Sequence, residues 1–418
     1  MKDSRFQWIG MIPANWKCER GKYILKYMQK PIKLDDGVIT CFRDGEVTLR
    51  SKRREDGFTM ADKEIGYQGI DVGDLVVHGM DGFAGAIGIS DSRGKASPVL
   101  NVLDTKQNKK YIMYFLRSMA YNNVFLALAT GIRVRSCDLR WNKLAELYYP
   151  IPPLDEQNRI AAFLDIKCSE IDALTMDIQA EIDTLEEYKR SVIMEKVTKG
   201  LEPNVEMKNS GIEWVGEIPH DWNKIKIKYA TIEIKKGISP DYTEAEKTKI
   251  INQATFSKGF FDIENIRFAN DDFNKSKGKV QRNDVLLATT GGGVLGKTYY
   301  FDEEGEFLAS TDVAYLRVDT SKLLAKFLYY CLTINYAMFN DLMANGSTNQ
   351  THFDMPSLFN MFLPLPNIKT QNIIIDYLDK KCLEIEDIIT KKKQQLEILN
   401  QYKKSMIYEY VTGKKEVV

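Results

Sequence analysis

The chain has 418 residues, of which 44% are hydrophobic and 28% charged, and its 58 lysines and arginines balance 58 aspartates and glutamates. This length allows about two to four domains that each bury a core, and the composition is typical of soluble globular proteins. A balanced total charge gives no indication of a polyanionic partner, although it can conceal local basic surfaces. No apolar run approaches the roughly 20 residues of a membrane span, and the N-terminus lacks the apolar core of a signal peptide. We therefore expect a cytoplasmic protein with no membrane partner.

A sixteen-residue phrase occurs twice in the chain. "MKDSRFQWIGMIPANW" begins at Met1, and "MKNSGIEWVGEIPHDW" begins at Met207. Four of the five tryptophans lie in these phrases, which makes chance a poor explanation. The corresponding positions are Trp8, Gly10, Ile12, Pro13 and Trp16 in the first copy and Trp214, Gly216, Ile218, Pro219 and Trp222 in the second.

The repeat extends over the whole chain. "YPIPPLDEQNRIAAFLD" matches "LPLPNIKTQNIIIDYLD", with Gln157 at the position of Gln371, and "GDLVVHGMDGFAG" resembles "NDVLLATTGGGVLG". The corresponding ends of the two halves are alike, whereas their middle segments have diverged almost completely. Two copies of one unit tend to pack about a pseudo-twofold axis, as a homodimer does.

The repeat divides the chain into four segments. Residues 1–150 form the first lead-in and variable domain, and residues 151–206 form the first long helix. Residues 207–363 form the second lead-in and variable domain, and residues 364–418 form the second long helix.

Each constant segment at the end of a half predicts a long helix. From Glu156 to about Lys196, apolar residues recur at spacings of three, four and seven, and the second copy repeats the stripe with Lys392 in the place of Ile178. Prolines precede each stripe and mark where the helix begins. Forty helical residues span about 60 Å, and we expect the two helices to bury their stripes by pairing antiparallel. The alternative is that each helix packs only on its own domain, and at such a contact face a lysine usually extends its ammonium group to solvent.

The two variable segments have mixed sequence character. Short β-type runs such as "GDLVVHG" and "DVAYLRV" stand beside helical stretches such as "KKYIMYFLRSMAYNNVFLALA". Each segment has the length of one domain. We therefore predict an α/β (α+β) fold in which two variable domains are joined by two long antiparallel helices.

Basic clusters lie in both variable segments. Lys and Arg suit phosphates, whereas Arg, Asn, Gln, Thr and His can also contact base edges in the major groove, so we predict DNA contacts here. In the first segment the candidates are Arg50, Lys52, Arg53, Arg54, Arg133, Arg135 and Arg140, and in the second they are Lys275, Lys277, Lys279, Arg282, Thr348, Asn349, Gln350 and His352. For any single cluster the alternative is a solvated charged loop. The argument rests on corresponding placement, because a polar loop follows Gly131 in one half and Gly346 in the other.

The segment "TTGGGVLGKT" from Thr289 satisfies the spacing of a phosphate-binding loop. Its counterpart in the first half, "MDGFAGAIG", has no lysine, and "GKTYYF" continues with strand-like residues where a phosphate loop must open a helix. We therefore predict a glycine-rich turn between strands, with nucleotide binding as the alternative.

The sequence contains no self-contained catalytic site. HExxH, GxSxG and Cys/His metal motifs do not occur, and no methyltransferase motif of the [N/D]PP[Y/F] type is present. The six cysteines are scattered without a CxxC pair, which indicates reduced thiols. We expect a non-enzymatic chain that binds no metal or cofactor itself and takes part in chemistry only through partners.

The chain resembles the specificity subunit of type I restriction–modification enzymes. The resemblance is carried by the two W-x-G-x-I-P-x-x-W phrases, by "PIPPLDEQNRIAAFLD" and "PLPNIKTQNIIIDYLD", and by "EYKRSVIMEKVTKGL" running into "MKNSGIEWVGEIP". These motifs cover the constant parts of both halves, and their order is specific. The second half departs from the pattern, with "NIKTQ" where "PLDEQ" stands in the first.

The resemblance implies two target-recognition domains separated by an antiparallel coiled coil. It implies that double-stranded DNA is bound at a bipartite, asymmetric site, and that the chain directs two modification subunits and the restriction subunits to that site. S-adenosylmethionine, ATP and Mg²⁺ would be bound by those subunits, and target adenines would be flipped into the modification subunits. The repeated Trp and Pro residues are then expected to pack the lead-ins against the frame rather than to touch DNA.

Two other classes of protein compete with this interpretation. A coiled-coil scaffold without DNA specificity would explain the helices but not the divergent, polar loops of the variable domains. A free-standing methyltransferase or nuclease would need motifs that the sequence lacks.

Overall fold

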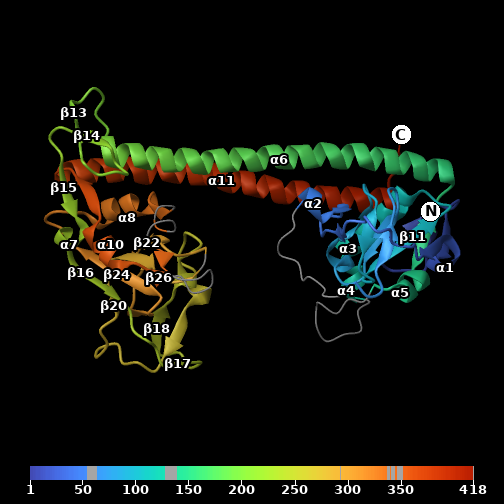
Figure 1. The fold of residues 1–418 in the computed structure, drawn as a ribbon, viewed down its shortest axis with the longest axis horizontal. Helices are drawn as coiled ribbons and strands as arrows, with labels where there is room; N and C mark the ends of the chain where they lie inside the picture. The colour runs from blue at the N-terminus through green and yellow to red at the C-terminus, as the bar shows by residue number, and fades with distance from the viewer. Residues whose placement is uncertain are drawn as a thin grey trace. The chain divides into compact units, whose positions relative to one another are not determined.

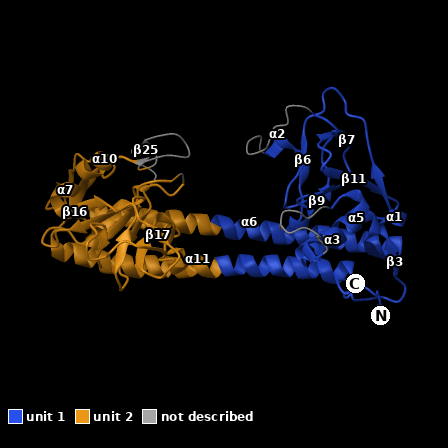
Figure 2. Cartoon of the chain, turned by 90° about the horizontal axis from the view of Figure 1, so that it is seen from below, with its two compact units in different colours: residues 1–180, 393–418 blue, residues 181–392 orange. Residues whose placement is uncertain are grey.

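The computed structural model describes residues 1–53, 64–127, 139–291, 293–336, 339, 344–345 and 352–417. The chain divides into two compact units, which are coloured separately in Figure 2. Unit 1 consists of residues 1–180 and 393–418, and unit 2 consists of residues 181–392. The division runs through both long helices, so each unit contains a part of each helix.

The two long helices are α6 (Leu154–Lys199) and α11 (Ile368–Val411), close to the bounds expected from the apolar stripes. In unit 1, the rings of Phe163 and Tyr410 lie 4.5 Å apart, and Lys403 of α11 donates to Asp172 of α6. In unit 2, Lys189 of α6 donates to Glu386 of α11. Residue numbers rise along one helix as they fall along the other, which confirms the predicted antiparallel pairing (Figure 1).

Lys392 lies at the contact face between the helices in unit 2, as its position in the stripe predicts. Its ammonium group donates to the carboxylate of Glu181 on α6. The side chain of Glu181 is 56% exposed, and that of Lys392 is 25% exposed. The lysine therefore extends to the rim of the helix pair and finds a counter-charge there.

Unit 1 is built on a four-stranded antiparallel sheet. Its order is β4 (Leu25–Met28), β11 (Leu100–Thr105), β8 (Leu75–His78) and β9 (Ile87–Ile89). The predicted helical stretch after this sheet is α3 (Lys109–Tyr121), followed by the short α4 (Val124–Ala127). Nine of the thirteen side chains of α3 are buried, so the helix forms the centre of the unit 1 core.

The other elements of unit 1 are small. They are β1 (Lys2–Asp3), β2 (Met11–Ile12), β3 (Lys17–Arg20), α1 (Gly21–Ile24), β5 (Ile39–Cys41), β6 (Val47–Leu49), α2 (Arg50–Arg53), β7 (Gln68–Ile70), the 3-10 turn η1 (Gly82–Ala84), β10 (Gly94–Ala96), α5 (Trp141–Glu146) and β12 (Tyr148–Ile151). Strands β1–β2, β3–β12, β5–β6 and β7–β10 form antiparallel pairs.

Unit 2 repeats the central sheet with the same strand order. Strands β16 (Thr231–Lys236), β24 (Val313–Val318), β21 (Val285–Ala288) and β22 (Thr298–Tyr300) are all antiparallel neighbours. The helix α8 (Ala325–Thr333) follows β24 as α3 follows β11. The internal repeat that the sequence predicts is thus also a repeat of topology.

Unit 2 adds a five-stranded sheet that has no counterpart of this size in the described residues of unit 1. Its order is β17 (Tyr242–Thr243), β19 (Arg267–Ala269), β18 (Thr248–Ile251), β23 (Phe307–Ala309) and β20 (Lys279–Val280), with β18 and β23 parallel. The remaining elements are β13 (Met207–Asn209), β14 (Glu217–Pro219), β15 (Asn223–Lys226), α7 (Ile227–Ala230), η3 (Gln253–Thr255), η4 (Ile263–Asn265), β25 (Ala344–Asn345), β26 (His352–Phe353), α10 (Met355–Asn360) and β27 (Phe362–Leu365).

Two fully buried glutamines connect the long helices to the variable domains. Gln157 of α6 accepts from the backbone N–H of Asn108, which precedes α3, and donates to the carbonyl of Pro152. Gln371 of α11 accepts from the N–H of Leu324, which precedes α8, and donates to the carbonyl of Pro366. The repeated glutamine therefore fixes the start of a core helix in each unit.

The repeated lead-in phrases pack against helix ends. Trp16 is buried, and its indole N–H donates to Glu156 at 3.0 Å. A Cβ built on Gly413, just beyond α11, would lie only 3.1 Å from the Trp16 ring, and one on Gly200, just beyond α6, would lie 3.1 Å from the ring of Trp222. Tryptophan and glycine thus fit closely in both units, as expected for a packing role.

Candidate nucleic-acid interface

The first basic cluster forms the short helix α2 at the end of the β5–β6 hairpin in unit 1. Arg50 donates through Nε to Thr40 at 2.9 Å. Lys52 donates to Ser92 at 2.7 Å, and Arg53 forms hydrogen bonds to Asp44 at 2.5 and 3.1 Å. These cations are therefore held in place by polar partners near the surface.

Arg53 also lies over an aromatic ring. Its guanidinium carbon is 4.1 Å from the centroid of Phe42, a distance at which cation and ring attract. The hydrogen bond to Asp44 raises the pKa of Arg53, so this group is charged at every pH of interest. A surface ion pair of this kind contributes little to stability.

Beside α2 lies a cleft of about 840 Å³ in unit 1. Its polar lining includes three arginines, a histidine and two aspartates. The lining residues are Ile39, Thr40, Cys41, Phe42, Arg43, Asp44, Arg50, Arg53, His78, Asp81, Ser97, Val99 and Leu100. Arginine in a polar, open cleft is the residue type that recognises phosphates and guanine edges.

Three residues that line this cleft, Arg43, His78 and Asp81, were not predicted from the sequence. Arg43 donates to Asp81 at 2.8 Å, and the backbone N–H of Asp81 donates to Nδ1 of His78 at 2.9 Å. Burial lowers the pKa of His78, so the imidazole is favoured in its neutral form. The only sequence signal was the position of His78 and Asp81, which lie just before and within "MDGFAGAIG", the segment that corresponds to "TTGGGVLGK" in the second half.

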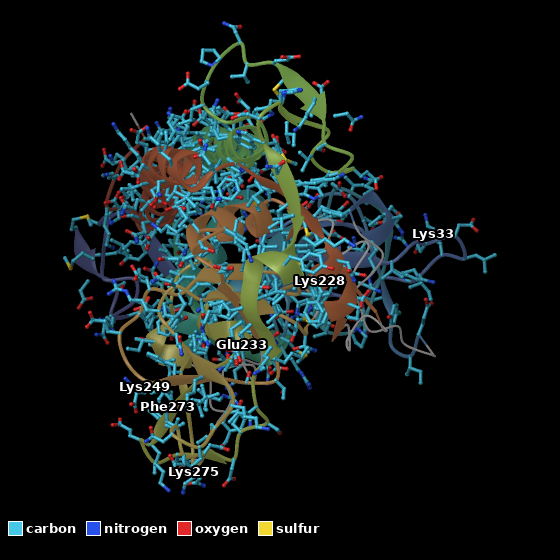
Figure 3. The ribbon with its side chains drawn as sticks, turned by 90° about the vertical axis from the view of Figure 1, so that its left-hand side faces the viewer. Lys33, Lys228, Glu233, Lys249, Phe273 and Lys275 are labelled. Carbon is cyan, nitrogen blue, oxygen red and sulfur yellow. The ribbon has the colours of Figure 1, made fainter. Side chains whose placement is uncertain are left out.

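The second basic cluster surrounds strand β20 in unit 2. Lys275, which is labelled near the lower edge of Figure 3, is 85% exposed and pairs with Asp272. Lys279 donates to the carbonyl of Asn274 and lies 5.0 Å from the ring of Phe273. Lys277 is also exposed, so these lysines form one basic edge of unit 2.

Arg282 lies in the turn after β20 and pairs with Asp302 at 2.5 Å. A further cation of this sheet was not predicted: Arg267 of β19 lies over the ring of Tyr242 on β17 at 5.4 Å. Arg267 is exposed, and its strand partner in the register is Ile250 of β18. A basic and an aromatic side chain therefore lie together on this sheet.

The glycine-rich segment connects β21 to β22, as predicted. Leu287 pairs with Thr298, and Gly296 donates its N–H to the carbonyl of Ala288 across the hairpin. The residues after Gly296 continue as a strand and not as a helix, so the element that a phosphate loop requires is replaced by β22.

Polar side chains gather beside this hairpin. Thr290 donates to Asp312 at 2.8 Å and lies 3.3 Å from the side-chain oxygen of Gln253. Lys297 donates to the carbonyl of Ser257 at 2.7 Å. The β8–β9 hairpin of unit 1 occupies the same place in the strand order and carries His78 and Asp81 instead.

Several predicted contact residues lie outside the described part of the chain. These are Arg54, Arg133, Arg135, Thr348, Asn349 and Gln350. For His352 only the backbone is described, as part of β26. Arg140 is exposed at the N-cap of α5, and its DNA contact stays a prediction.

In each unit, a buried aspartate pairs with a partly buried cation. In unit 1, Lys30 donates to Asp71 and to the buried Asp74, and with Arg93 it lowers the pKa of Asp71 to about 2. In unit 2, Arg317 donates to Asp284 at 2.8 Å, while burial raises the pKa of Asp284. Asp74 and Asp284 correspond in the repeat, which indicates a shared structural role.

Within the described residues there is no group of three or more His, Cys, Asp or Glu side chains that could hold a metal ion. Burial raises the pKa of the Cys41 thiol to about 12, as expected for a packing cysteine. Among the same residues, no helix has the length and apolar character that a membrane span requires.

Comparison with known proteins assigns a class to this architecture. Residues 216–398 match the family model of the type I restriction modification DNA specificity domain. The type I restriction enzyme MjaVIII specificity subunit of Methanocaldococcus jannaschii is 27% identical over 77% of this chain and 74% of its own. The EcoBI specificity subunit of Escherichia coli is 22% identical over 81% of this chain and 73% of its own.

Solved structures share the fold. A chain from a study of complex assembly and conformational transition in the type I R-M system aligns with a TM-score of 0.72 at 14% identity, covering 97% of this chain and all of the other. The HsdS subunit of Thermoanaerobacter tengcongensis aligns with a TM-score of 0.50 at 15% identity, over 99% of this chain and all of its own. Residues 216–398 therefore carry a type I restriction modification DNA specificity domain, and most of the chain is similar in sequence to type I restriction enzyme specificity subunits.

Proposed function

We propose that this chain recognises a bipartite, asymmetric DNA site, with one variable domain for each half. The observation that supports this most strongly is the contrast between equivalent hairpins on a repeated frame. The β8–β9 hairpin carries His78 and Asp81 beside Arg43, whereas at the β21–β22 hairpin Thr290 lies with Gln253 and Asp312. Two sheets of the same topology that carry different polar side chains are suited to recognising two different DNA sequences.

The basic residues of each unit supply the phosphate contacts in this proposal. Phosphates fix the register of a protein on DNA, and base edges carry the sequence information. Arg50, Lys52 and Arg53 would act in the first domain, and Lys275, Lys277, Lys279 and Arg282 in the second.

The partners in this proposal are modification and restriction subunits, and the long helices would bind the modification subunits. Apolar side chains are exposed at corresponding places: Leu174 of α6 and Tyr402 of α11 in unit 1, and Ile388 of α11 and Tyr188 of α6 in unit 2. Each unit thus presents the same pair of residue positions, which favours two copies of one partner. Chemistry, with S-adenosylmethionine, ATP and Mg²⁺, would reside in those subunits, and this chain would be non-catalytic.

Replacing one variable domain tests the proposal. A chain in which residues 21–149 are exchanged for the corresponding segment of a relative, expressed with its modification partner, should methylate a site with one altered and one unchanged half. Sequencing of methylated positions in the host genome measures this directly. An exchange that altered both halves, or neither, would contradict the assignment of one domain to each half-site.

The phosphate contacts are tested by salt dependence. Alanine at Arg50, Lys52 and Arg53 together should weaken DNA binding by the complex and reduce the slope of log affinity against log salt by about 0.9 for each phosphate that is no longer neutralised. Lys110 is a matched control, because it is 54% exposed and pairs with Asp165 away from the cleft. A triple variant with the slope of the Lys110→Ala protein would show that the three cations are merely solvated.

A further inference from the structure

Arg43 lies at the tip of a two-stranded antiparallel ribbon, β5–β6, in which Cys41 pairs with Val47. The N–H of Phe42 donates to the carbonyl of Glu46, and the N–H of Gly45, at a φ of +91°, donates to the carbonyl of Phe42, which closes the turn. A two-stranded ribbon is one of the elements that fit the major groove of DNA. The ribbon therefore carries an exposed arginine in a geometry suited to base edges.

The ribbon tip is fixed to the body of unit 1 by a second arginine. Arg117 of α3 donates to the carbonyl of Gly45 at 2.8 Å and to the carbonyl of Ile87 in β9 at 2.7 Å. A Cβ at Gly45 would lie 1.7 Å from the Arg117 guanidinium, so only glycine allows this contact. The position of Arg43 is thus set by core elements and does not depend on a free loop.

The guanidinium of Arg43 is oriented by Asp81. Nε and Nη2 donate to Oδ1 of Asp81 at 3.3 and 2.8 Å. An arginine has five N–H bonds, so the edge formed by Nη1 and Nη2 still has two parallel N–H bonds that point away from this carboxylate. The Arg43 side chain is 66% exposed, which makes that edge accessible.

Asp81 is itself held in place. Its N–H donates to Nδ1 of His78 at 2.9 Å, and its carbonyl accepts from the N–H of Ala84 at 2.9 Å. Gly85, at a φ of +100°, brings this turn against the ribbon, since a Cβ there would lie 2.8 Å from the carbonyl oxygen of Arg43. The arginine, the aspartate and the histidine therefore form one preorganised group.

The chemistry of this group favours a base over a phosphate. Asp81 neutralises the charge of Arg43 and would repel phosphate oxygens, whereas the remaining pair of N–H bonds matches the O6 and N7 acceptors of guanine. Adenine presents a donor at the corresponding position, and the edge of Arg43 has no acceptor to offer it. We propose that Arg43 recognises a guanine in the half-site of the first domain and that Asp81 is its positioning residue. This inference rests on the proposed function in DNA recognition.

Atom substitution in the DNA tests the contact. The complex of the full chain with its modification subunits is titrated with duplexes in which each guanine of the site is replaced in turn by 7-deazaguanine, which lacks the N7 acceptor. At one position in the first half-site, we expect the wild-type complex to bind the substituted duplex about tenfold more weakly than the unmodified duplex. R43A should bind the unmodified duplex and the duplex substituted at that position equally well. At the other guanines it should show the same loss of affinity on substitution as the wild-type complex. D81N should lose part of the discrimination, because the guanidinium is no longer held in one plane.

A matched control separates this contact from a general loss of charge. Arg20 of unit 1 also pairs with a carboxylate, that of Glu146, its side chain is 41% exposed, and it lies outside the cleft. R20A should therefore retain the full loss of affinity for the substituted duplex. The inference is overturned if R43A keeps the penalty at every position, or if R43A weakens binding to all duplexes alike and lowers the salt slope by about one, as removal of a phosphate-binding cation would. A wild-type complex that shows no sequence-specific binding would overturn the proposed function and this inference with it.

Discussion

At the scale of single residues, the repeated glutamines show how a frame can stay constant while domains diverge. Gln157 and Gln371 are fully buried, and each bridges a helix entrance to the backbone that precedes a core helix. Backbone groups are independent of side-chain identity, so the contact survives changes in the sequence of the variable domain. The residue that joins the constant part to the variable part is accordingly one that binds main chain.

We predict that Gln157→Ala destabilises unit 1 by about 2–4 kcal/mol, because the buried N–H of Asn108 and the carbonyl of Pro152 would lose their partner. Gln371→Ala should have an effect of the same size in unit 2. Chemical denaturation of the purified chain measures both changes. Asn158→Ala is the matched control, since the neighbouring Asn158 is exposed and its replacement should cost less than about 1 kcal/mol. Equal effects of the two α6 variants would refute the role of the buried amide.

Contacts between residues that are distant in the chain could not be inferred from the sequence. Gln157 was visible as a repeated position, but its partner Asn108 lies 49 residues earlier in the chain and outside any motif. The pair Arg43 and Asp81 is separated by 38 residues and lies in the diverged segments, where the repeat gives no guide. Candidate phosphate contacts could be named from composition, whereas base contacts depend on such non-local geometry.

At the scale of elements, long helices were predictable and short strands were not. The helices α6 and α11 follow from an apolar stripe that is repeated over many turns, and their observed ends lie close to the predicted ones. The five-stranded sheet of unit 2 contains strands of two to four residues, among them β17 and β20. Such strands carry almost no periodic signal, and their pairing is decided by contacts between distant segments.

The contact face between the helices offers a test of packing against charge. We predict that Lys392→Ile, which restores the residue type of Ile178, leaves stability unchanged or raises it by up to about 1 kcal/mol. The pair with Glu181 is partly exposed and worth little, while the isoleucine adds apolar packing. Thermal unfolding compares this variant with Lys391→Ile, in which the replaced side chain is 68% exposed and no stabilisation is expected. A destabilisation of more than about 2 kcal/mol for Lys392→Ile alone would show that the ion pair is needed at this position.

At the scale of the whole molecule, the repeat makes both units depend on both helices. Unit 1 contains the first part of α6 and the last part of α11, and unit 2 contains the complementary parts. The end of each helix contacts a lead-in phrase, through Gly200 with Trp222 and Gly413 with Trp16. A change in either long helix therefore alters a part of both units.

This division of roles leads to a prediction for the spacing of the two half-sites. Removing residues 179–182 from α6 and 391–394 from α11 shortens each helix by about one turn, or roughly 6 Å, and keeps the apolar stripes in phase. If the helices act as the spacer between the domains, the methylated site should retain both half-sites and lose about two base pairs of the gap, at about 3.4 Å for each pair. The methylation pattern of host DNA measures the gap. Deleting the four residues from α6 alone would place the two stripes out of register and should abolish methylation instead. A doubly shortened chain that methylates sites with the original gap would show that the spacing is set elsewhere.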